Sequence, residues 1–164
     1  MADLPVQADS AFGAALVTAE QVFREHHDNV YRIALSLSGN RADAEDIAQE
    51  TFVAIIGALP GYRGEARLST WIYRITLRVG MRWLARRKLA DELPTDLVAM
   101  DQSIPVDLIR AMSRLPMDSR MVILLIAIEG LSHAEVAEIL AIPVGTVASR
   151  LHYARQRLVD LLDS

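Results

Sequence analysis

The chain has 164 residues, of which 52% are apolar, so it can form one folded domain or two small ones. It contains no cysteine, which excludes disulfide scaffolds, thiolate zinc sites and cysteine nucleophiles. Leu and Ala are abundant whereas Gly, Pro and aromatic residues are few, a composition that favours an all-α protein. The longest apolar run, Met121 to Ile128, is too short to cross a membrane, and the acidic N-terminus lacks the basic residues of a secretory signal. We therefore expect a cytoplasmic protein that does not insert into membranes.

The net charge of −4 hides a strong asymmetry along the chain. Residues 1–60 carry nine acidic and three basic side chains, whereas residues 61–88 carry eight basic side chains and one acidic side chain. All the cationic residues except Lys88 are arginines, which can bind a phosphate through two N–H groups at once. A basic segment of this kind indicates contact with nucleic acid.

A first helix is predicted between a capping box at Thr18 and Gln21 and a glycine stop at Gly39. A second helix is predicted from about Arg41 to Leu59, before Pro and Gly break it. The 4-3-4-3 spacing in the first helix predicts a buried stripe of Phe23, His27, Val30, Ala34 and Leu37. Residues 1–17 show no clear periodicity, so we expect them to form a flexible N-terminus.

A basic loop, residues 62–68, leads into a third helix that Ser69 or Thr70 can cap and that ends near Lys88. An arginine recurs every four residues on one side of this helix, at Arg74, Arg78, Arg82 and Arg86. Residues four apart drift by only about 40° around a helix, so the four guanidinium groups are predicted to form one basic ridge. Trp71 belongs to the apolar stripe of the same helix and is therefore expected in the core.

Residues 89–106 hold two prolines and no stable apolar period, which indicates a flexible linker. A second helical module is predicted from Asp107 to the C-terminus. Within it, Asp118 or Ser119 can cap a helix that contains the apolar run of residues 121–128. This run could also be a strand, but its helical neighbours favour a buried helix.

A helix-turn-helix pattern occupies residues 131–158. A capping box at Ser132 and Glu135 opens a short helix, and a tight connection at residues 141–143 leads into a longer one. In DNA-binding proteins of this type the second helix lies in the major groove. Its exposed donors, which suit phosphates and base edges, are Thr146, Ser149, Arg150, His152 and Arg155. On this pattern alone, a plain helical hairpin within a bundle stays open as an alternative.

Both modules resemble the bacterial RNA polymerase sigma factors of the small, extracytoplasmic-function (ECF) type. The C-terminal module resembles sigma region 4 in its motifs EGLS (129–132), EVAEIL (135–140) and IPVGTV (142–147). The N-terminal module resembles sigma region 2 in DAED (43–46), QETF (49–52), YRGE (62–65) and STWIYRI (69–75). Two independent motif sets in family order make the resemblance specific. It divides the chain into residues 18–88 as region 2, 89–106 as linker and 107–164 as region 4.

The resemblance implies a sigma factor that binds core RNA polymerase and promoter DNA, uses no cofactor and is not an enzyme. The residues that it implies for polymerase docking are Asp43, Asp46, Gln49 and Glu50. Those implied for the −10 promoter element are Tyr62, Arg63, Arg67, Tyr73, Arg74, Arg78 and Arg82, and those for the −35 element are Thr146, Ser149, Arg150, His152 and Arg155. An anti-sigma protein is a further implied partner. The histidines have no H-E-x-x-H spacing and no cysteine beside them, so no metal site is expected.

The recognition helix departs from the family pattern at two positions. Ala148 stands where a basic residue is usual and Tyr153 where arginine is common, while Ala141 replaces the connecting glycine. These departures leave the −35 preference open. Two other interpretations therefore stay in view: a sigma-like module that sequesters a regulator, and a free-standing helix-turn-helix regulator. The acidic face and basic loop of region 2 argue against the free-standing regulator, which needs neither.

Overall fold

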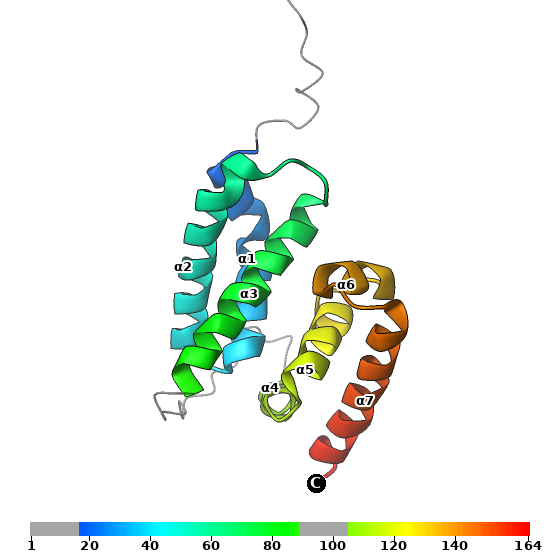
Figure 1. Cartoon of the computed structure of the whole chain (residues 1–164). Coiled ribbons are helices and arrows are strands. Elements are labelled where there is room, and N and C mark those ends of the chain that lie inside the picture. Colours follow the sequence, from blue (N-terminus) through cyan, green and yellow to red (C-terminus); the bar gives the residue numbers. More distant parts are fainter. Residues whose placement is uncertain (1–16, 89–104) are drawn as a thin grey trace, which may run out of the picture.

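The structure is a computed structural model that describes residues 17–88 and 105–164, and within these ranges it contains helices and no strand. The all-α class is therefore confirmed. The helices are α1 (Ala19–Ser38), α2 (Arg41–Ala58), the 3-10 turn η2 (Leu59–Gly61), α3 (Leu68–Lys88), α4 (Val106–Ser113), α5 (Met117–Ile123), the π-helical turn η3 (Leu124–Ile128), α6 (His133–Leu140) and α7 (Val144–Leu162). Helices α1 to α3 form one module and α4 to α7 a second one beside it (Figure 1). In the described ranges, no helix combines the length and the apolar character that crossing a membrane requires.

The first helix begins and ends where its capping residues predict, and the second begins at Arg41 as predicted. The Thr18 hydroxyl accepts from the Gln21 N–H at 3.2 Å, and the Gln21 side chain accepts from the Thr18 N–H at 3.0 Å. Gly39 ends α1 in the left-handed region, at φ 78°, and Asn40 caps α2 by accepting from the Asp43 N–H at 2.9 Å. The predicted capping box and glycine stop are both confirmed.

Helix α3 begins earlier than predicted. It starts at Leu68, and the Trp71 N–H donates to the Arg67 carbonyl at 3.0 Å, so the predicted caps Ser69 and Thr70 lie inside the helix. The assignment of a hydroxyl cap was therefore wrong. Packing explains the difference, because Leu68 lies against the core of the module and Thr70 is buried.

The core of the N-terminal module lies between α1, α2 and α3 and is rich in branched aliphatic side chains such as Ile47, Ile55 and Ile72. Trp71 packs against it, as its place on the apolar stripe predicts. The predicted stripe of α1 is wrong at its first residue: Phe23 is 50% exposed, and its neighbour Val22 is buried instead.

The second module begins with α4 and α5. Pro116 precedes α5 and no side chain caps it, so the predicted cap at Asp118 or Ser119 was wrong. The carboxylate of Asp118 instead pairs with Arg150 of α7 at 3.2 Å, and Ser119 is buried. The apolar run that follows is helical rather than extended, as predicted, and its second half forms the π-helical turn η3.

Helices α6 and α7 form the predicted helix-turn-helix. Glu135 donates its N–H to the Ser132 hydroxyl at 3.2 Å and accepts from the Ser132 N–H at 2.7 Å, which confirms the capping box. Ala141 ends α6 in the left-handed region, at φ 53°. The residues that α7 buries are the predicted stripe, Val147, Leu151, Ala154 and Leu158.

The two modules are packed against each other. One core cluster contains Ile33, Leu37, Tyr73 and Leu77 of the N-terminal module together with the buried aliphatic residues of α4 to α7. Helix α3 lies against α6, and α1 lies against α4. The predicted linker, residues 89–106, lies almost wholly outside the described residues.

Candidate functional site

The acidic face of α2 contains the four residues expected to dock on a polymerase. Asp46 and Gln49 are exposed. Glu50 accepts hydrogen bonds from Arg86, and Asp43 is buried and forms an ion pair with Arg87 near the end of α3. Asp46 and Gln49 of the expected docking set therefore face solvent, whereas Glu50 and Asp43 are paired with arginines of α3.

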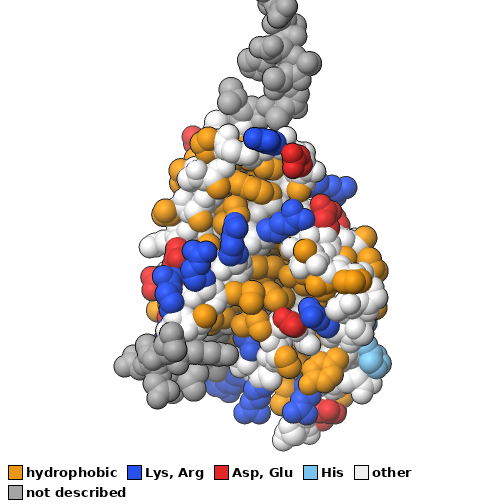
Figure 2. Space-filling view, in the orientation of Figure 1, with side chains coloured by type: hydrophobic (Ala, Val, Ile, Leu, Met, Phe, Trp, Pro, Cys, Tyr) orange, Lys and Arg blue, Asp and Glu red, His pale blue; other side chains and the backbone are white. Residues whose placement is uncertain are grey.

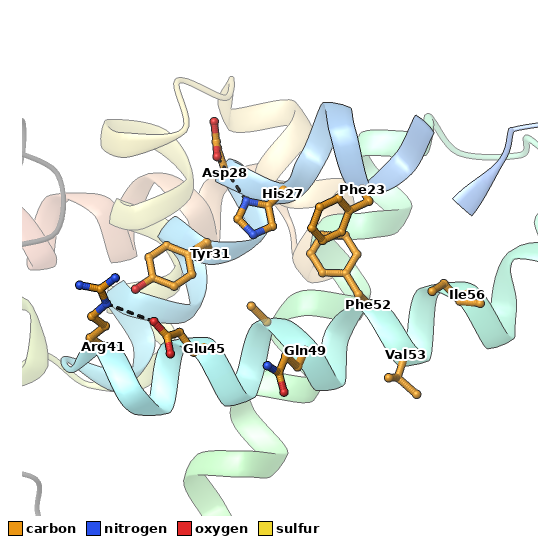
Figure 3. A pocket seen from close by; sticks show the side chains of 11 residues that line it. Phe23, His27, Asp28, Tyr31, Arg41, Glu45, Gln49, Phe52, Val53 and Ile56 are labelled. Carbon is orange, nitrogen blue, oxygen red and sulfur yellow. Dashed lines mark hydrogen bonds and ion pairs between the residues drawn. The ribbon is translucent and has the colours of Figure 1, made fainter. Parts of the chain in front are cut away.

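An open groove between α1 and α2, of about 860 Å³, lies beside this acidic face (Figure 3). Phe23 and Phe52 meet in it with their ring centroids 4.9 Å apart, and His27 lies parallel to Phe52 at 6.0 Å. Val53 and Ile56 are exposed at its end. Sequence reasoning missed this groove because Phe23 and His27 fit the spacing of the predicted core stripe, whereas in the structure Phe23 is exposed and His27 is only partly buried.

In the basic loop before α3, Tyr62 forms a hydrogen bond that joins the two ends of the loop. The Tyr62 hydroxyl donates to the Ala66 carbonyl at 2.7 Å, and its ring lies 5.0 Å from that of Trp71. Arg63 points outward and is exposed. The loop therefore presents an exposed planar cation, Arg63, next in sequence to the half-buried Tyr62.

The four arginines that form the row on α3 differ in whether they have a partner within the protein. Arg86, at its C-terminal end, is engaged by Glu50, and Arg74, at its N-terminal end, donates to the Glu138 carbonyl at 2.7 Å. Arg78 and Arg82, between them, are exposed. In Figure 2 cationic side chains gather on the face over which α3 runs. All four arginines of the predicted ridge are exposed, but among the described residues only Arg78 and Arg82 of the four have no hydrogen-bond or ion-pair partner.

Three of the residues expected at the −10 element contact the second module. The Tyr73 hydroxyl donates to Glu129 at 3.0 Å, Arg74 binds the Glu138 carbonyl, and Arg67 lies 3.3 Å from the Glu135 carboxylate. Tyr73 is only 6% exposed. Its burial, with the neighbouring Glu129 carboxylate, raises the pKa of the Tyr73 hydroxyl far above its ordinary value.

The recognition helix α7 presents most of its expected contact set to solvent. Ser149, His152 and Arg155 are exposed, and Thr146 is half-buried. Arg150 is held by its ion pair with Asp118, which fixes the guanidinium at the edge of the helix. Ala148 and Tyr153 are exposed on the same helix, so the departures from the family pattern lie at the surface.

Two regions of the chain match known sequence families. The sigma-70 region 2 family matches residues 22–90, and the sigma-70 region 4 family matches residues 106–158. The chain belongs to the sigma-70 family of sigma factors. The N-terminal module, α1 to α3, is region 2 of this sigma factor, and the helix-turn-helix lies in its region 4.

Curated relatives place the chain in the ECF group of this family. It is 35% identical over 163 residues to the ECF RNA polymerase sigma factor SigE of Mycolicibacterium smegmatis, a match that covers 91% of this chain and 63% of SigE. It is 32% identical over 149 residues to SigM of Mycobacterium tuberculosis, with 87% of this chain and 76% of SigM covered. The chain thus spans less than two thirds of SigE but about three quarters of SigM.

Solved structures of sigma factors share the fold. CnrH, solved in complex with the cytosolic domain of CnrY, is 29% identical and has a TM-score of 0.68 over 88% of this chain and 87% of that one. RpoE of Bartonella quintana, solved in complex with the anti-sigma factor NepR, is 25% identical and has a TM-score of 0.74 over 88% of this chain and 96% of that one.

The contacts between regions 2 and 4 involve residues that sequence reasoning did not select. Arg32 of α1 donates to both carboxylate oxygens of Glu129, at 2.7 and 3.1 Å. Arg120 of α5 donates to the Leu37 carbonyl of α1 at 3.4 Å. A lone Arg or Glu on a predicted helix reads as a surface charge, so only the folded sigma factor reveals these pairs.

Proposed function

We propose that this chain is a promoter-recognition subunit, which binds core RNA polymerase and directs it to −10 and −35 elements. The observation that carries the proposal is the pairing of a helix-turn-helix with exposed donors on α7 and a separate helix, α3, with exposed arginines. A free-standing regulator needs the helix-turn-helix alone. The chain would act in the cytoplasm, where polymerase and promoters are.

Docking on polymerase would use the acidic face of α2. Asp46 and Gln49 stand one turn apart and are exposed, so they can meet a basic helix of the partner. Glu50 would join them if the partner replaced Arg86. The apolar groove with Phe23 and Phe52 lies beside this face and would extend the contact area.

The −10 element would be opened and held by the loop at residues 62–67 and by α3. Holding an unstacked strand requires cations for its phosphates and planar groups for its bases. Arg78 and Arg82 supply exposed cations, and Arg63 supplies a planar cation on the loop. Binding energy would open the duplex, so no catalytic residue, metal or cofactor is required for this role.

The −35 element would be read by the exposed face of α7. Ser149, His152 and Arg155 can donate to phosphates and base edges in the major groove. Thr146 and Arg150 stand beside them, with Arg150 oriented by Asp118. The domain limits predicted from the sequence, 18–88 and 107–164, would be the two DNA-reading units.

An anti-sigma protein is a proposed further partner. CnrH and RpoE were solved with CnrY and NepR respectively, and both resemble this chain over both of its modules. The exposed apolar side chains Phe23, Val53 and Ile56 offer such a partner a surface beside the docking face.

Transcription reconstituted from purified core polymerase and this chain tests the proposal. The expected result is RNA that starts at particular promoters and is lost without the chain. Core polymerase that binds the chain but starts no RNA would favour the second candidate, a sigma-like module that sequesters a regulator. The engagement of Tyr73 and Arg74 by region 4 is the observation that keeps this second candidate in view.

A further inference from the structure

The most basic part of the chain contains a single acidic residue. Residues 61–88 carry eight basic side chains, and Glu65 is the only acidic residue of this segment. It lies in the loop that leads into α3, between Arg63 and Arg67, and all three side chains are exposed (Figure 1). This loop belongs to the surface proposed to hold the −10 strand, where an anion repels phosphates. A carboxylate at this position therefore weakens binding to DNA unless it makes a favourable contact of its own.

The Glu65 carboxylate is not used within the described part of the protein. Among the described residues it has no ion-pair or hydrogen-bond partner, although Arg63 and Arg67 are only two residues away. Arg67 pairs instead with Glu135 of region 4, at 3.3 Å. No N–H of the first turn of α3 donates to Glu65 either. The carboxylate therefore neither pairs with a neighbouring arginine nor caps the helix that follows.

Hydrogen bonds tie both ends of the loop that carries Glu65. At its start the Tyr62 N–H donates to the Leu59 carbonyl at 3.0 Å, and at its end the Trp71 N–H donates to the Arg67 carbonyl at 3.0 Å. The Tyr62 hydroxyl crosses the loop and donates to the Ala66 carbonyl at 2.7 Å, a bond that we call the Tyr62–Ala66 bridge. The Tyr62 ring lies 5.0 Å from that of Trp71, which packs against the core. These contacts connect the loop to the core and restrict the conformations of its tip.

The tip of the loop has a backbone conformation that favours glycine. Gly64, which directly precedes Glu65, has a φ of 76°, in the left-handed region. A Cβ added at Gly64 would have no neighbour within 4 Å, so lack of space is not the reason for a glycine here. Gly61, on the other side of Tyr62, also has open space around it but no positive φ. Of these two glycines, only Gly64 depends on the conformational freedom of glycine.

We infer that Glu65 is a specificity-determining residue of the −10 site: its carboxylate, positioned by the Tyr62–Ala66 bridge, accepts a hydrogen bond from the exocyclic amino group of one unpaired base. This inference rests on the proposed role of the loop at the −10 element. A carboxylate is an acceptor, so it matches the amino group that adenine, cytosine and guanine carry. An unpaired base exposes this group on its Watson–Crick edge. Thymine lacks it and presents two carbonyl oxygens there, which repel the carboxylate.

A base-reading carboxylate and a merely solvated one respond differently to removal. If Glu65 is only solvated, Glu65→Ala removes an anion near the phosphates and tightens binding to every strand by the same factor. If Glu65 reads a base, the same variant weakens binding to a strand with the matching amino group, because the acceptor is lost. Its binding to a strand of thymines alone should not weaken. The ratio of the two affinities therefore identifies the role of Glu65.

The first test measures this ratio by fluorescence anisotropy. Holoenzyme reconstituted from core polymerase and the full chain is titrated with single-stranded thymine tracts that carry one central adenine, cytosine or guanine, or none. The best of the three should bind about tenfold more tightly than the all-thymine tract. Glu65→Ala should remove most of this difference, whereas Glu25→Ala, which removes an exposed carboxylate on α1, should not. If Glu65→Ala leaves every ratio intact, the inference is overturned.

Deleting the amino group from the DNA tests the same contact from the other side. Purine in place of adenine, pyrimidin-2-one in place of cytosine and hypoxanthine in place of guanine each lack the amino group and keep the ring. In the preferred tract this replacement should weaken binding by the unmodified chain about tenfold. It should hardly affect Glu65→Ala, because both changes remove one hydrogen bond. Losses that multiply would show that the carboxylate and the amino group do not meet, and would overturn the inference.

The Tyr62–Ala66 bridge is tested by variants that keep Glu65. Tyr62→Phe retains the ring beside Trp71 but loses the hydroxyl, and should lower the preference for the amino-bearing tract about fivefold. Gly64→Ala should act in the same way, because alanine disfavours a φ of 76°, whereas its control Gly61→Ala should not. Binding of the all-thymine tract and its salt dependence should stay unchanged. An equal loss for all tracts would show that the bridge supports the fold and does not position Glu65.

The same titrations with the free chain separate this inference from the proposed function, because they need no polymerase. If the free chain prefers the amino-bearing tract through Glu65 but starts no RNA with core polymerase, the base contact stands and the proposed function falls. If RNA starts at particular promoters and Glu65→Ala changes no base preference, the proposed function stands and the inference falls.

Discussion

Arg86 of α3 donates two hydrogen bonds to the carboxylate of Glu50 on α2, each with an N–O distance of 3.0 Å. This pair joins the last arginine of the basic row to the expected docking face. Both groups are partly exposed, so the pair adds little to stability, and its effect is mainly on which charges are available. Arg86 is paired within the protein, whereas Arg78 and Arg82 have no ion-pair partner among the described residues.

This difference predicts unequal roles within the arginine row. Arg78→Ala and Arg82→Ala should each weaken promoter binding at all sequences and reduce the slope of log affinity against log salt by about one. Arg86→Ala is the matched control on the same helix and should change the slope much less. Titrations of holoenzyme with promoter DNA at several salt concentrations measure these slopes. Unchanged slopes for Arg78→Ala and Arg82→Ala would show that this side of α3 does not face DNA.

Asp46 and Asp43 should separate docking from folding. Asp46 is exposed, so Asp46→Arg should abolish co-purification with core polymerase while changing the free energy of unfolding by no more than about 0.5 kcal/mol. Asp43 is buried against Asn40 and Arg87, so Asp43→Ala should lower the free energy of unfolding by about 1 to 3 kcal/mol.

Urea denaturation and pull-down with tagged polymerase distinguish these two outcomes. If Asp46→Arg unfolds the chain, its carboxylate is structural and the docking assignment fails. If it folds and still binds polymerase, docking uses another surface, and the groove at Phe23 and Phe52 becomes the first alternative.

The sequence predicted those parts of the fold whose causes are local. The capping boxes at Thr18 and Ser132 and the stripe of α7 depend on residues within one or two turns, and all three are found as predicted. The early start of α3 at Leu68 could not be predicted in this way, because its cause is packing against the core.

The candidate site was predictable as a set of residues but not as an arrangement. Arg32 and Glu129 are separated by most of the chain and have no local signal, yet they form a bidentate pair. Tyr73 was assigned to DNA from its motif, and only tertiary packing places it against Glu129. Long-range pairs of this kind depend on how the modules meet, which helical periodicity does not encode.

Ala141 is held in a conformation that disfavours side chains. Its φ of 53° lies in the left-handed region, where a Cβ costs roughly 1 kcal/mol. Ala141→Gly should therefore raise the free energy of unfolding, by about 0.5 to 1 kcal/mol once the extra entropy of glycine in the unfolded chain is included. Ala148→Gly, inside α7, is the control. It should lower the free energy of unfolding by about 1 kcal/mol, because glycine disfavours a helix interior. Denaturant titrations of both variants give the comparison, and a destabilised Ala141→Gly would contradict the argument.

At Ala148, the surface of α7 that is proposed to face DNA lacks a cationic side chain, and an arginine there should supply one. The residue is exposed beside Ser149, so Ala148→Arg can reach a phosphate without disturbing the core. One new hydrogen bond from a charged donor should tighten binding to a −35 duplex by roughly 1 kcal/mol, or about fivefold. Gln156→Arg adds the same charge farther along the helix, where it is exposed, and should tighten binding much less. Fluorescence anisotropy with duplex DNA measures both. If Ala148→Arg leaves DNA affinity untouched and instead disrupts binding to a protein partner, α7 serves protein contact, and the sequestering module becomes the better account of this chain.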